Sequence, residues 1–130
     1  MIVLDASAAV EVLLQTAAGA PITERLLDPA ESLHAPHLLD VEVAQILRRF
    51  VRRGELMSDR ARQALDDLAS LPLERYSHEI LMSRVWMLRE NLTAYDAAYV
   101  ALAEVLDATL LTRDGRISRA PSHAARVEVF

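Results

Sequence analysis

The sequence contains no cysteine, which excludes disulfide bonds, thiolate nucleophiles and the common structural zinc sites with cysteine ligands. Any metal site must therefore use oxygen or histidine ligands. Lysine is also missing, because all 14 basic residues are arginine. Its absence excludes P-loop nucleotide chemistry, Schiff-base enzymes and phospho-acceptor receiver domains, each of which depends on a lysine at its site.

Long apolar runs are missing too. The chain is 52% hydrophobic, but no run approaches the roughly 20 residues that a membrane helix needs. The opening residues do not resemble a signal peptide, since Asp5 and Glu11 interrupt them and no basic segment precedes them. We therefore expect a cytoplasmic protein with no membrane segment. A length of 130 residues predicts a single domain over residues 1–130.

The formal net charge is −5, which does not by itself exclude a nucleic-acid partner. The arginines between residues 48 and 53 fit the solvated end of a helix, where the macrodipole favours positive charge. Arg113, Arg116 and Arg119 are better candidates for phosphate contacts because they adjoin Asp114.

The hydrophobic pattern alternates between short strands and helices. Strands are expected at residues 2–4, 32–35, 109–112 and 126–130. Helices are expected at residues 7–14, 21–27, 36–53, 58–68, 79–89 and 94–106, with a turn or short helix around 116–118. Met57, Met82, Met87 and Trp86 fit core or interface positions. This order predicts an α/β domain with a small, mostly parallel sheet, in which ligands gather at the carboxyl ends of the strands.

Four acidic residues interrupt or directly end apolar runs: Asp5, Glu42, Asp96 and Asp114. Carboxylates placed against a core are costly unless they are paired, neutralised or bound to a cation. Asp5 and Asp114 fall at or just beyond the ends of predicted strands, so the fold could bring them to one edge of the sheet. Asp40, a competitor of Glu42, has less apolar helical neighbours and is expected to be a solvated carboxylate.

Each acid also has a purely structural interpretation. Glu42 could reach solvent from the margin of an apolar stripe, and Asp96 follows Thr93 at the spacing of a helix-capping motif. Asp5 could cap the helix that follows it, and Asp114 with Gly115 could form a simple turn. These interpretations are credible one at a time, but four together are less so.

Clustered carboxylates repel one another and their pKa values rise unless a cation neutralises them. An all-oxygen site suits Mg²⁺ or Mn²⁺, which engage substrate phosphates, and two such ions can support phosphodiester hydrolysis by activated water. Ser7 and Thr112 could add hydroxyl contacts, although a helix cap and a strand-end hydroxyl are equally good interpretations. The four histidines show no metal-binding spacing.

At this point the sequence resembles a PIN domain, specifically the VapC-type toxins of bacterial toxin–antitoxin pairs. The motifs that carry the resemblance, specific in their order and spacing, are Ile2–Ala8, Ala35–Val43, Leu92–Ala103 and Leu111–Asp114. By this resemblance, Asp5, Glu42, Asp96 and Asp114 correspond to the catalytic, metal-binding quartet of the family. Ser7 and Thr112 correspond to its supporting polar positions.

The resemblance implies a three-layer α/β/α sandwich and an endoribonuclease that depends on Mg²⁺ or Mn²⁺. It also implies a homodimer, an RNA substrate and inhibition by a small cognate antitoxin. Two alternatives stay open: a PIN-like nuclease in RNA or DNA processing without an antitoxin, and a catalytically silent interaction module whose acids only cap helices.

Overall fold

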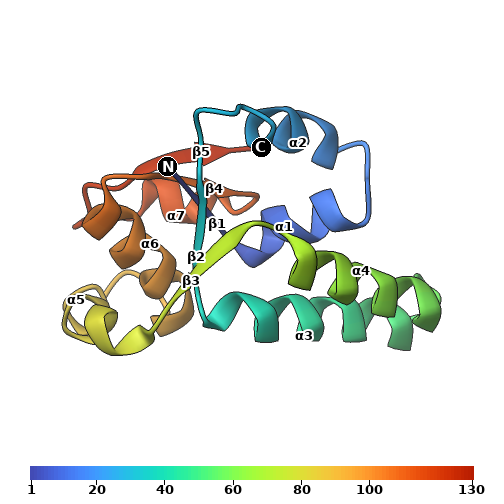
Figure 1. Cartoon of the computed structure of the whole chain (residues 1–130). Coiled ribbons are helices and arrows are strands. Elements are labelled where there is room, and N and C mark those ends of the chain that lie inside the picture. The colour runs from blue at the N-terminus through green and yellow to red at the C-terminus, as the bar shows by residue number, and fades with distance from the viewer.

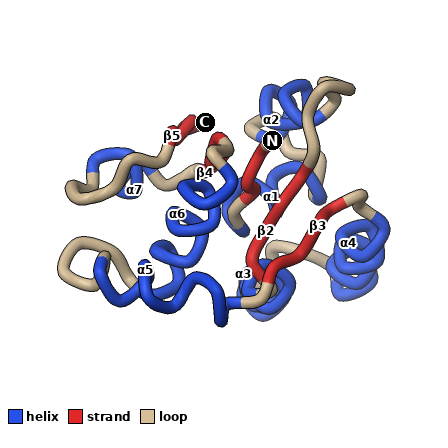
Figure 2. The backbone as a smooth tube through the Cα atoms, turned by 60° about the vertical axis from the view of Figure 1, so that its left-hand side comes forward, coloured by secondary structure: helices blue, strands red, loops and turns tan.

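Five parallel strands form the centre of this computed structural model, which describes residues 1–130. They lie in the order β3-β2-β1-β4-β5, and every neighbouring pair is parallel. The strands are β1 (Ile2–Leu4), β2 (Leu33–Pro36), β3 (Leu73–Tyr76), β4 (Thr109–Thr112) and β5 (Arg126–Val129). All carboxyl ends therefore meet at one edge of the sheet (Figure 2).

Seven α-helices and one 3₁₀ turn connect the strands. They are α1 (Ala6–Leu13), α2 (Gly19–Leu26), α3 (Leu38–Arg52), α4 (Ser58–Ser70), the 3₁₀ turn η1 (His78–Leu81), α5 (Met82–Met87), α6 (Ala94–Leu106) and α7 (Gly115–Arg119). Helices α1 to α4 lie on one side of the sheet and α5 to α7 on the other (Figure 1). The three-layer α/β/α sandwich predicted from the sequence is thus confirmed. No helix has the length and apolar character needed to cross a membrane.

The sheet and α6 form the centre of the core. All three residues of β1 are fully buried, and seven consecutive residues of α6, from Ala97 to Ala103, are buried as well. A helix that is apolar on every side must be enclosed, and α6 contacts β1, β2 and β4. Small alanines let it approach the strands closely, so its first turn is held beside the carboxyl ends of β1 and β4.

The chain changes direction at β1. After β1 it adds β2 and then β3 on one side, and it returns to place β4 on the other side. In open parallel sheets this reversal leaves a crevice beyond the carboxyl ends of the two central strands, where ligands usually bind. The residues that directly follow β1 and β4 therefore lie at this crevice.

The structure corrects two predictions outside this region. The helix expected at residues 79–89 is divided into η1 and the short α5, because the Ser77 hydroxyl accepts a hydrogen bond from the Glu79 amide and starts a 3₁₀ turn. Trp86 and the three methionines are more than half exposed, so of the two positions expected for them the core is wrong, and an interface stays a prediction. Trp86 is covered instead by Arg89, whose guanidinium carbon lies 4.7 Å from the ring centroid.

Two glycines provide a test of this packing. A methyl group on Gly19 would overlap the backbone carbonyl oxygen of Glu11 where α2 meets α1, whereas Gly54 has φ +72° and open space around it. We expect Gly19→Ala to lower the free energy of unfolding by about 2–3 kcal/mol, because the backbone must shift. Gly54→Ala should cost only about 1 kcal/mol from the unfavourable dihedral. Urea denaturation measures both, and equal losses would contradict the packing described at α1 and α2.

Candidate active site

Asp5 directly follows β1 and is almost fully buried, with 5% of its surface exposed. It is the N-cap of α1, since its Oδ1 accepts a hydrogen bond of 2.9 Å from the Ala8 amide. The Ser7 hydroxyl donates to the same oxygen at 2.7 Å, and the Thr112 hydroxyl donates to Oδ2. Burial raises the pKa of Asp5, and these hydrogen bonds oppose the rise.

Ser7 and Thr112 join the ends of β1 and β4. The Ser7 oxygen accepts a hydrogen bond of 2.9 Å from the Arg113 amide, and the Thr112 oxygen accepts one of 2.9 Å from the Asp114 amide. Of the two interpretations of Ser7, the helix cap is wrong, because Asp5 occupies that position. Both hydroxyls instead orient the Asp5 carboxylate and the loop that carries Asp114.

Glu42 projects from α3 and is half-buried. Its Oε1 is buried and has no hydrogen-bond partner. Burial is the largest cause of its raised pKa, and the charges of Asp96 and Asp5 raise it further. The structure therefore does not support a glutamate that simply reaches solvent, because one oxygen of this carboxylate is buried and has no protein donor to compensate its charge.

Asp96 lies in the first turn of α6, where its amide donates a hydrogen bond of 3.1 Å to the Thr93 hydroxyl. Its carboxylate accepts no hydrogen bond from the Thr93 backbone amide, so only half of the capping motif is formed. Burial raises the pKa of Asp96 most, the negative charges of Asp114 and Asp5 raise it further, and the Thr93 hydroxyl opposes the rise. The carboxylate thus does not complete the capping box that the sequence allowed.

Asp114 is the N-cap of α7 and pairs with Arg116. Its Oδ1 accepts hydrogen bonds of 2.9 Å from both the amide and Nε of Arg116, while its Oδ2 lies 2.6 Å from Nη2. Hydrogen bonds from Arg116 hold the pKa of Asp114 below its usual value. Asp114 is therefore the only one of the four acids whose charge has a cationic side-chain partner.

The four acids thus come from separate parts of the chain to one edge of the sheet, where the charges of three of them raise the pKa of a neighbour: Asp5 acts on Glu42 and Asp96, Asp96 acts on Glu42, and Asp114 acts on Asp96. No three acidic or histidine side chains converge here into a formed metal-binding group. Both Asp5 oxygens accept hydrogen bonds from the Ser7 and Thr112 hydroxyls, and Asp114 forms an ion pair with Arg116.

The donor set nevertheless fits a hard divalent cation. All four side chains offer carboxylate oxygens, and one of these oxygens, Glu42 Oε1, is buried without any partner. Three of the four carboxylates have a pKa raised by burial. Such a group gains from a compensating positive charge, and Mg²⁺ and Mn²⁺ prefer oxygen ligands of this kind.

Asp40 is separate from this group. Its carboxylate forms a bidentate pair with Arg75 of β3, at 2.8 Å to Nε and 2.9 Å to Nη2. The sequence predicted a solvated carboxylate at Asp40. The side chain is indeed partly exposed, but it is also paired with a cation, which the sequence did not indicate. Asp40 thus supplies a carboxylate on the same helix as Glu42 that pairs with Arg75 of β3 and lies outside the acid cluster.

Tyr99 is a site residue that the sequence reading missed. It follows Asp96 by one helical turn on α6, is 2% exposed, and its hydroxyl has no hydrogen-bond partner. The Tyr99 hydroxyl is close enough to Glu42 for each to affect the pKa of the other, although no hydrogen bond of normal geometry joins them. The only feature of the sequence that could have indicated Tyr99 is its hydroxyl group, which is polar although the residue lies in the apolar run of α6, three residues after Asp96.

Comparisons with known proteins show which family this chain belongs to. The PIN domain model matches residues 2–122. A VapC ribonuclease of Mycobacterium bovis is 47% identical over 118 residues, which cover 91% of this chain and 89% of the relative. Ribonuclease VapC1 of Mycobacterium tuberculosis is 44% identical over 128 residues, which cover 98% of this chain and 96% of the relative.

Solved structures show the same fold. PAE2754 from Pyrobaculum aerophilum superimposes with a TM-score of 0.76 at 22% identity, covering 99% of this chain and 83% of the other. VapBC2 from Rickettsia felis, solved bound to a DNA fragment from its promoter, gives 0.73 at 17% identity and covers 99% and 98%. The chain belongs to the PIN-domain family and, within it, to the VapC group.

Proposed function

We propose that this protein is the toxin of a toxin–antitoxin pair and acts as an endoribonuclease that depends on Mg²⁺ or Mn²⁺. One observation carries the proposal: four carboxylates from separate elements gather at the crevice beyond β1 and β4, and three of them have pKa values raised by burial. The relatives that cover nearly the whole chain are named ribonucleases, which supports RNA as the substrate.

In this proposal Asp5, Glu42, Asp96 and Asp114 hold the divalent cation. When bound, the cation would supply activation of water and neutralisation of the charge that develops on the cleaved phosphate. Ser7 and Thr112 keep the buried Asp5 carboxylate in one orientation, so they are positioning residues. Tyr99 would restrict the movement of Glu42 and exclude water from its buried side.

Arg113 and Arg116 are proposed to contact the RNA backbone. The Arg116 guanidinium pairs with Asp114 and its side chain is 82% exposed, while Arg113 directly precedes Asp114 and its Nε lies 3.9 Å from Glu11. Because a phosphate is a good bidentate partner for arginine, an RNA phosphate would compete with Asp114 for Arg116. That exchange would leave the Asp114 oxygens available to the cation as the substrate binds.

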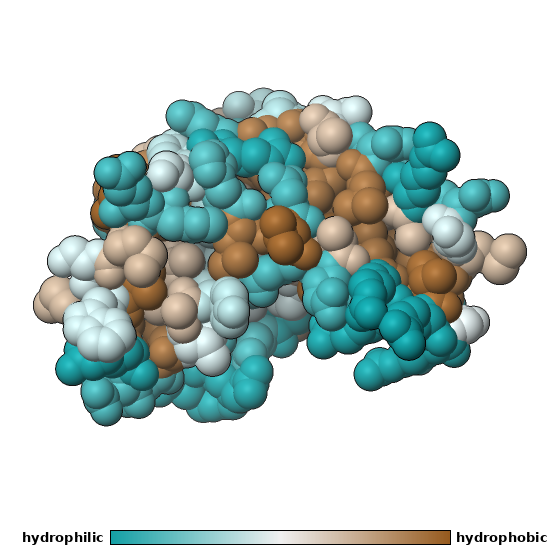
Figure 3. Space-filling model, turned by 90° about the horizontal axis from the view of Figure 1, so that it is seen from below, coloured by the Kyte–Doolittle hydropathy of each residue, from teal (hydrophilic) through white to brown (hydrophobic).

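We further propose that the protein forms a homodimer and is inhibited by a cognate antitoxin. The structural neighbour VapBC2 from Rickettsia felis supports an antitoxin partner. Large apolar side chains are exposed on η1 and α5, including Ile80, Trp86 and Met87. Viewed from below, apolar patches lie at the surface among hydrophilic side chains (Figure 3), and an apolar patch with a polar rim can form the core of a protein interface.

Expression alone should arrest growth, and co-expression of a small neighbouring reading frame should restore it. Absence of toxicity would argue for a processing nuclease instead.

Asp96→Asn tests the chemistry directly. It removes one negative charge from the cluster but keeps the shape of the side chain, so we expect RNA cleavage with Mg²⁺ or Mn²⁺ to fall at least about a hundredfold. Asp40→Asn is the matched control, because it removes a carboxylate outside the cluster and should leave cleavage within about twofold of wild type. Full activity of Asp96→Asn, or equal losses in both variants, would sink the assignment.

The raised pKa values predict an unusual dependence of stability on pH. Asp5, Glu42 and Asp96 bind protons more tightly when folded, so without metal their contribution to stability is lost as pH rises from their ordinary pKa values, near 4, through the raised ones. Asp114 has the opposite sign, because Arg116 lowers its pKa. In EDTA we therefore expect Asp96→Asn to unfold at a higher temperature than wild type at pH 7.5, and at a similar temperature at pH 4.

A bound cation should restore the stability that the ionised carboxylates cost the folded protein at neutral pH. Mn²⁺ should raise the melting temperature of wild type by several degrees at pH 7.5 and by less at pH 5, where protons compete for the carboxylates. Asp96→Asn should gain less from Mn²⁺ at either pH. Scanning calorimetry measures all four conditions, and a gain that does not depend on pH or on Asp96 would contradict a site built from these carboxylates.

A further inference from the structure

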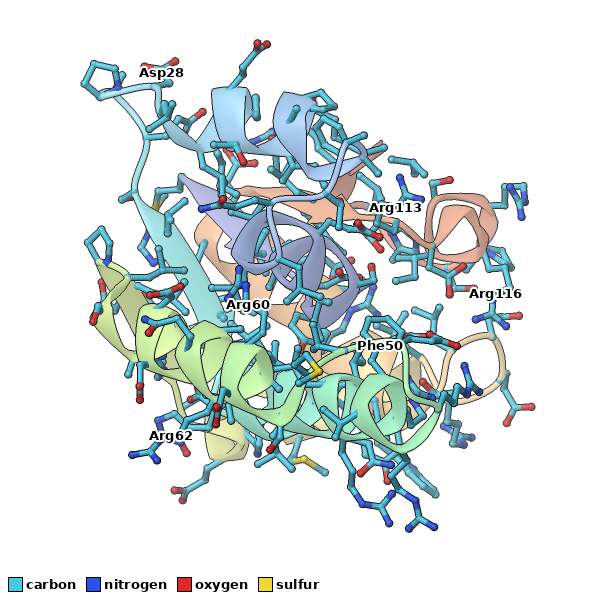
Figure 4. The ribbon with its side chains drawn as sticks, turned by 90° about the vertical axis from the view of Figure 1, so that its right-hand side faces the viewer. Asp28, Phe50, Arg60, Arg62, Arg113 and Arg116 are labelled. Carbon is cyan, nitrogen blue, oxygen red and sulfur yellow. The ribbon has the colours of Figure 1, made fainter.

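A second hollow adjoins the acid cluster on the other side of Ser7. It lies between α1 and α3 and has a volume of about 350 Å³, comparable with the smaller ligand-binding clefts of proteins. Its lining consists of Ser7, Val10, Glu11, Ile46, Arg49, Phe50, Arg53 and Arg113. Figure 4 shows Phe50 on α3 and Arg113 after β4 on this side of the molecule. We call this space the α1–α3 hollow.

The α1–α3 hollow is electropositive although the protein is acidic. Three guanidinium groups line it and only one carboxylate does. Arg49 and Arg53 are exposed and form no ion pair, whereas Arg75 and Arg84 pair with carboxylates at 2.8 Å and 2.7 Å. The one acid, Glu11, lies 3.9 Å from Arg113 and only loosely offsets its charge. These arginines are therefore available to an anionic ligand.

The hollow is continuous with the acid cluster through Ser7 and Arg113. Ser7 donates to Asp5 and accepts from the Arg113 amide, while its side chain also lines the hollow. Arg113 precedes Asp114 and extends into the same space. A nucleic-acid strand with one phosphate at the carboxylates could thus place a neighbouring nucleotide in the hollow without a change of direction.

The lining also offers apolar contacts. Phe50 is half-buried on α3, and Ile46 and Val10 lie beside it in the lining. An aromatic ring between arginines is the combination that single-stranded nucleic acids use, because phosphates pair with guanidinium groups and an unpaired base packs on an aromatic side chain. An acidic protein segment would satisfy the charges, but it would not account for the shared Ser7 and Arg113.

We propose that the α1–α3 hollow binds a nucleotide of single-stranded RNA that neighbours the cleaved phosphodiester. Arg49 and Arg53 bind the phosphates of this nucleotide, and Phe50 contacts its base. Arg113 contacts the RNA backbone between the hollow and the acid cluster. This inference rests on the proposed ribonuclease function. It adds α3 to the RNA-binding surface and assigns a role to arginines that the sequence suggested were only solvated.

The arrangement of α3 provides a matched control. Arg48 and Arg52 belong to the same helix and have the same spacing, but they line a different hollow, between α3 and α4. The double variants Arg49→Ala/Arg53→Ala and Arg48→Ala/Arg52→Ala therefore remove equal charge from two different faces of α3. Binding is measured in EDTA, to prevent metal-dependent cleavage, by fluorescence anisotropy with a labelled single-stranded RNA of roughly 12 nucleotides.

We expect Arg49→Ala/Arg53→Ala to weaken binding about tenfold, and the slope of log affinity against log salt to fall in magnitude by about 1.4, which corresponds to two lost phosphate contacts on a single strand. The control pair should change affinity by less than about threefold. Phe50→Leu should weaken binding about fivefold, and this loss should disappear with an abasic oligonucleotide, because the base contact is already missing.

Equal losses in the two double variants would overturn the proposal, since only the overall charge would then matter. It would also be overturned if the Arg49/Arg53 pair lost affinity for a polyglutamate peptide but kept its affinity for RNA, which would assign the hollow to an acidic protein segment. Cleavage is tested separately with Mn²⁺. RNA binding that depends on Arg49 and Arg53 without any cleavage would refute the ribonuclease function and leave the RNA-binding hollow in place.

Discussion

The buried carboxylate of Asp5 is the group on which the arrangement of the site depends. It ends the central strand β1, caps α1 through the Ala8 amide and receives both the Ser7 and Thr112 hydroxyls. These bonds connect the adjacent ends of β1 and β4, and the same hydroxyls hold the amides of Arg113 and Asp114. Each donor offsets part of the cost of burying a charge, so this one carboxylate fixes the position of the whole loop after β4.

The negative charges of Glu42 and Asp96 are offset by fewer donors than the charge of Asp5, and this difference bears on function. Asp114 has Arg116 as a partner, but the buried Oε1 of Glu42 has no donor, and Asp96 lies close enough to Asp5 and Asp114 for their charges to raise its pKa. A structure optimised only for stability would replace or pair these side chains. Their retention at the crevice is typical of a binding site whose ligand supplies the missing positive charge.

The sequence predicted best those elements whose local pattern matches their environment. Helix α6 and strand β4 have the predicted bounds, because α6 carries a long apolar run, Ala97–Ala103, after a capping threonine and β4 is a short, mostly buried run. Strand β3 was not identified, since Leu73–Tyr76 includes two charged residues and pairs with β2 only at the edge of the sheet. The convergence of the acids was inferred from strand ends, but the hydroxyl contacts of Asp5 and the unpartnered Tyr99 depend on tertiary placement that no local pattern encodes.

The arginines of α3 show why a cluster in sequence need not be a cluster in space. Residues four apart share a helix face, while adjacent residues differ by about 100° around the axis. Arg49 and Arg53 therefore face α1 and the acid cluster, whereas Arg48 and Arg52 face α4. The run looked like one basic helix end, but the packing of α3 between α1 and α4 divides it in two. Only one half adjoins Ser7 and Arg113, and that geometry, rather than the number of arginines, decides which of them can follow a strand that leaves the carboxylates.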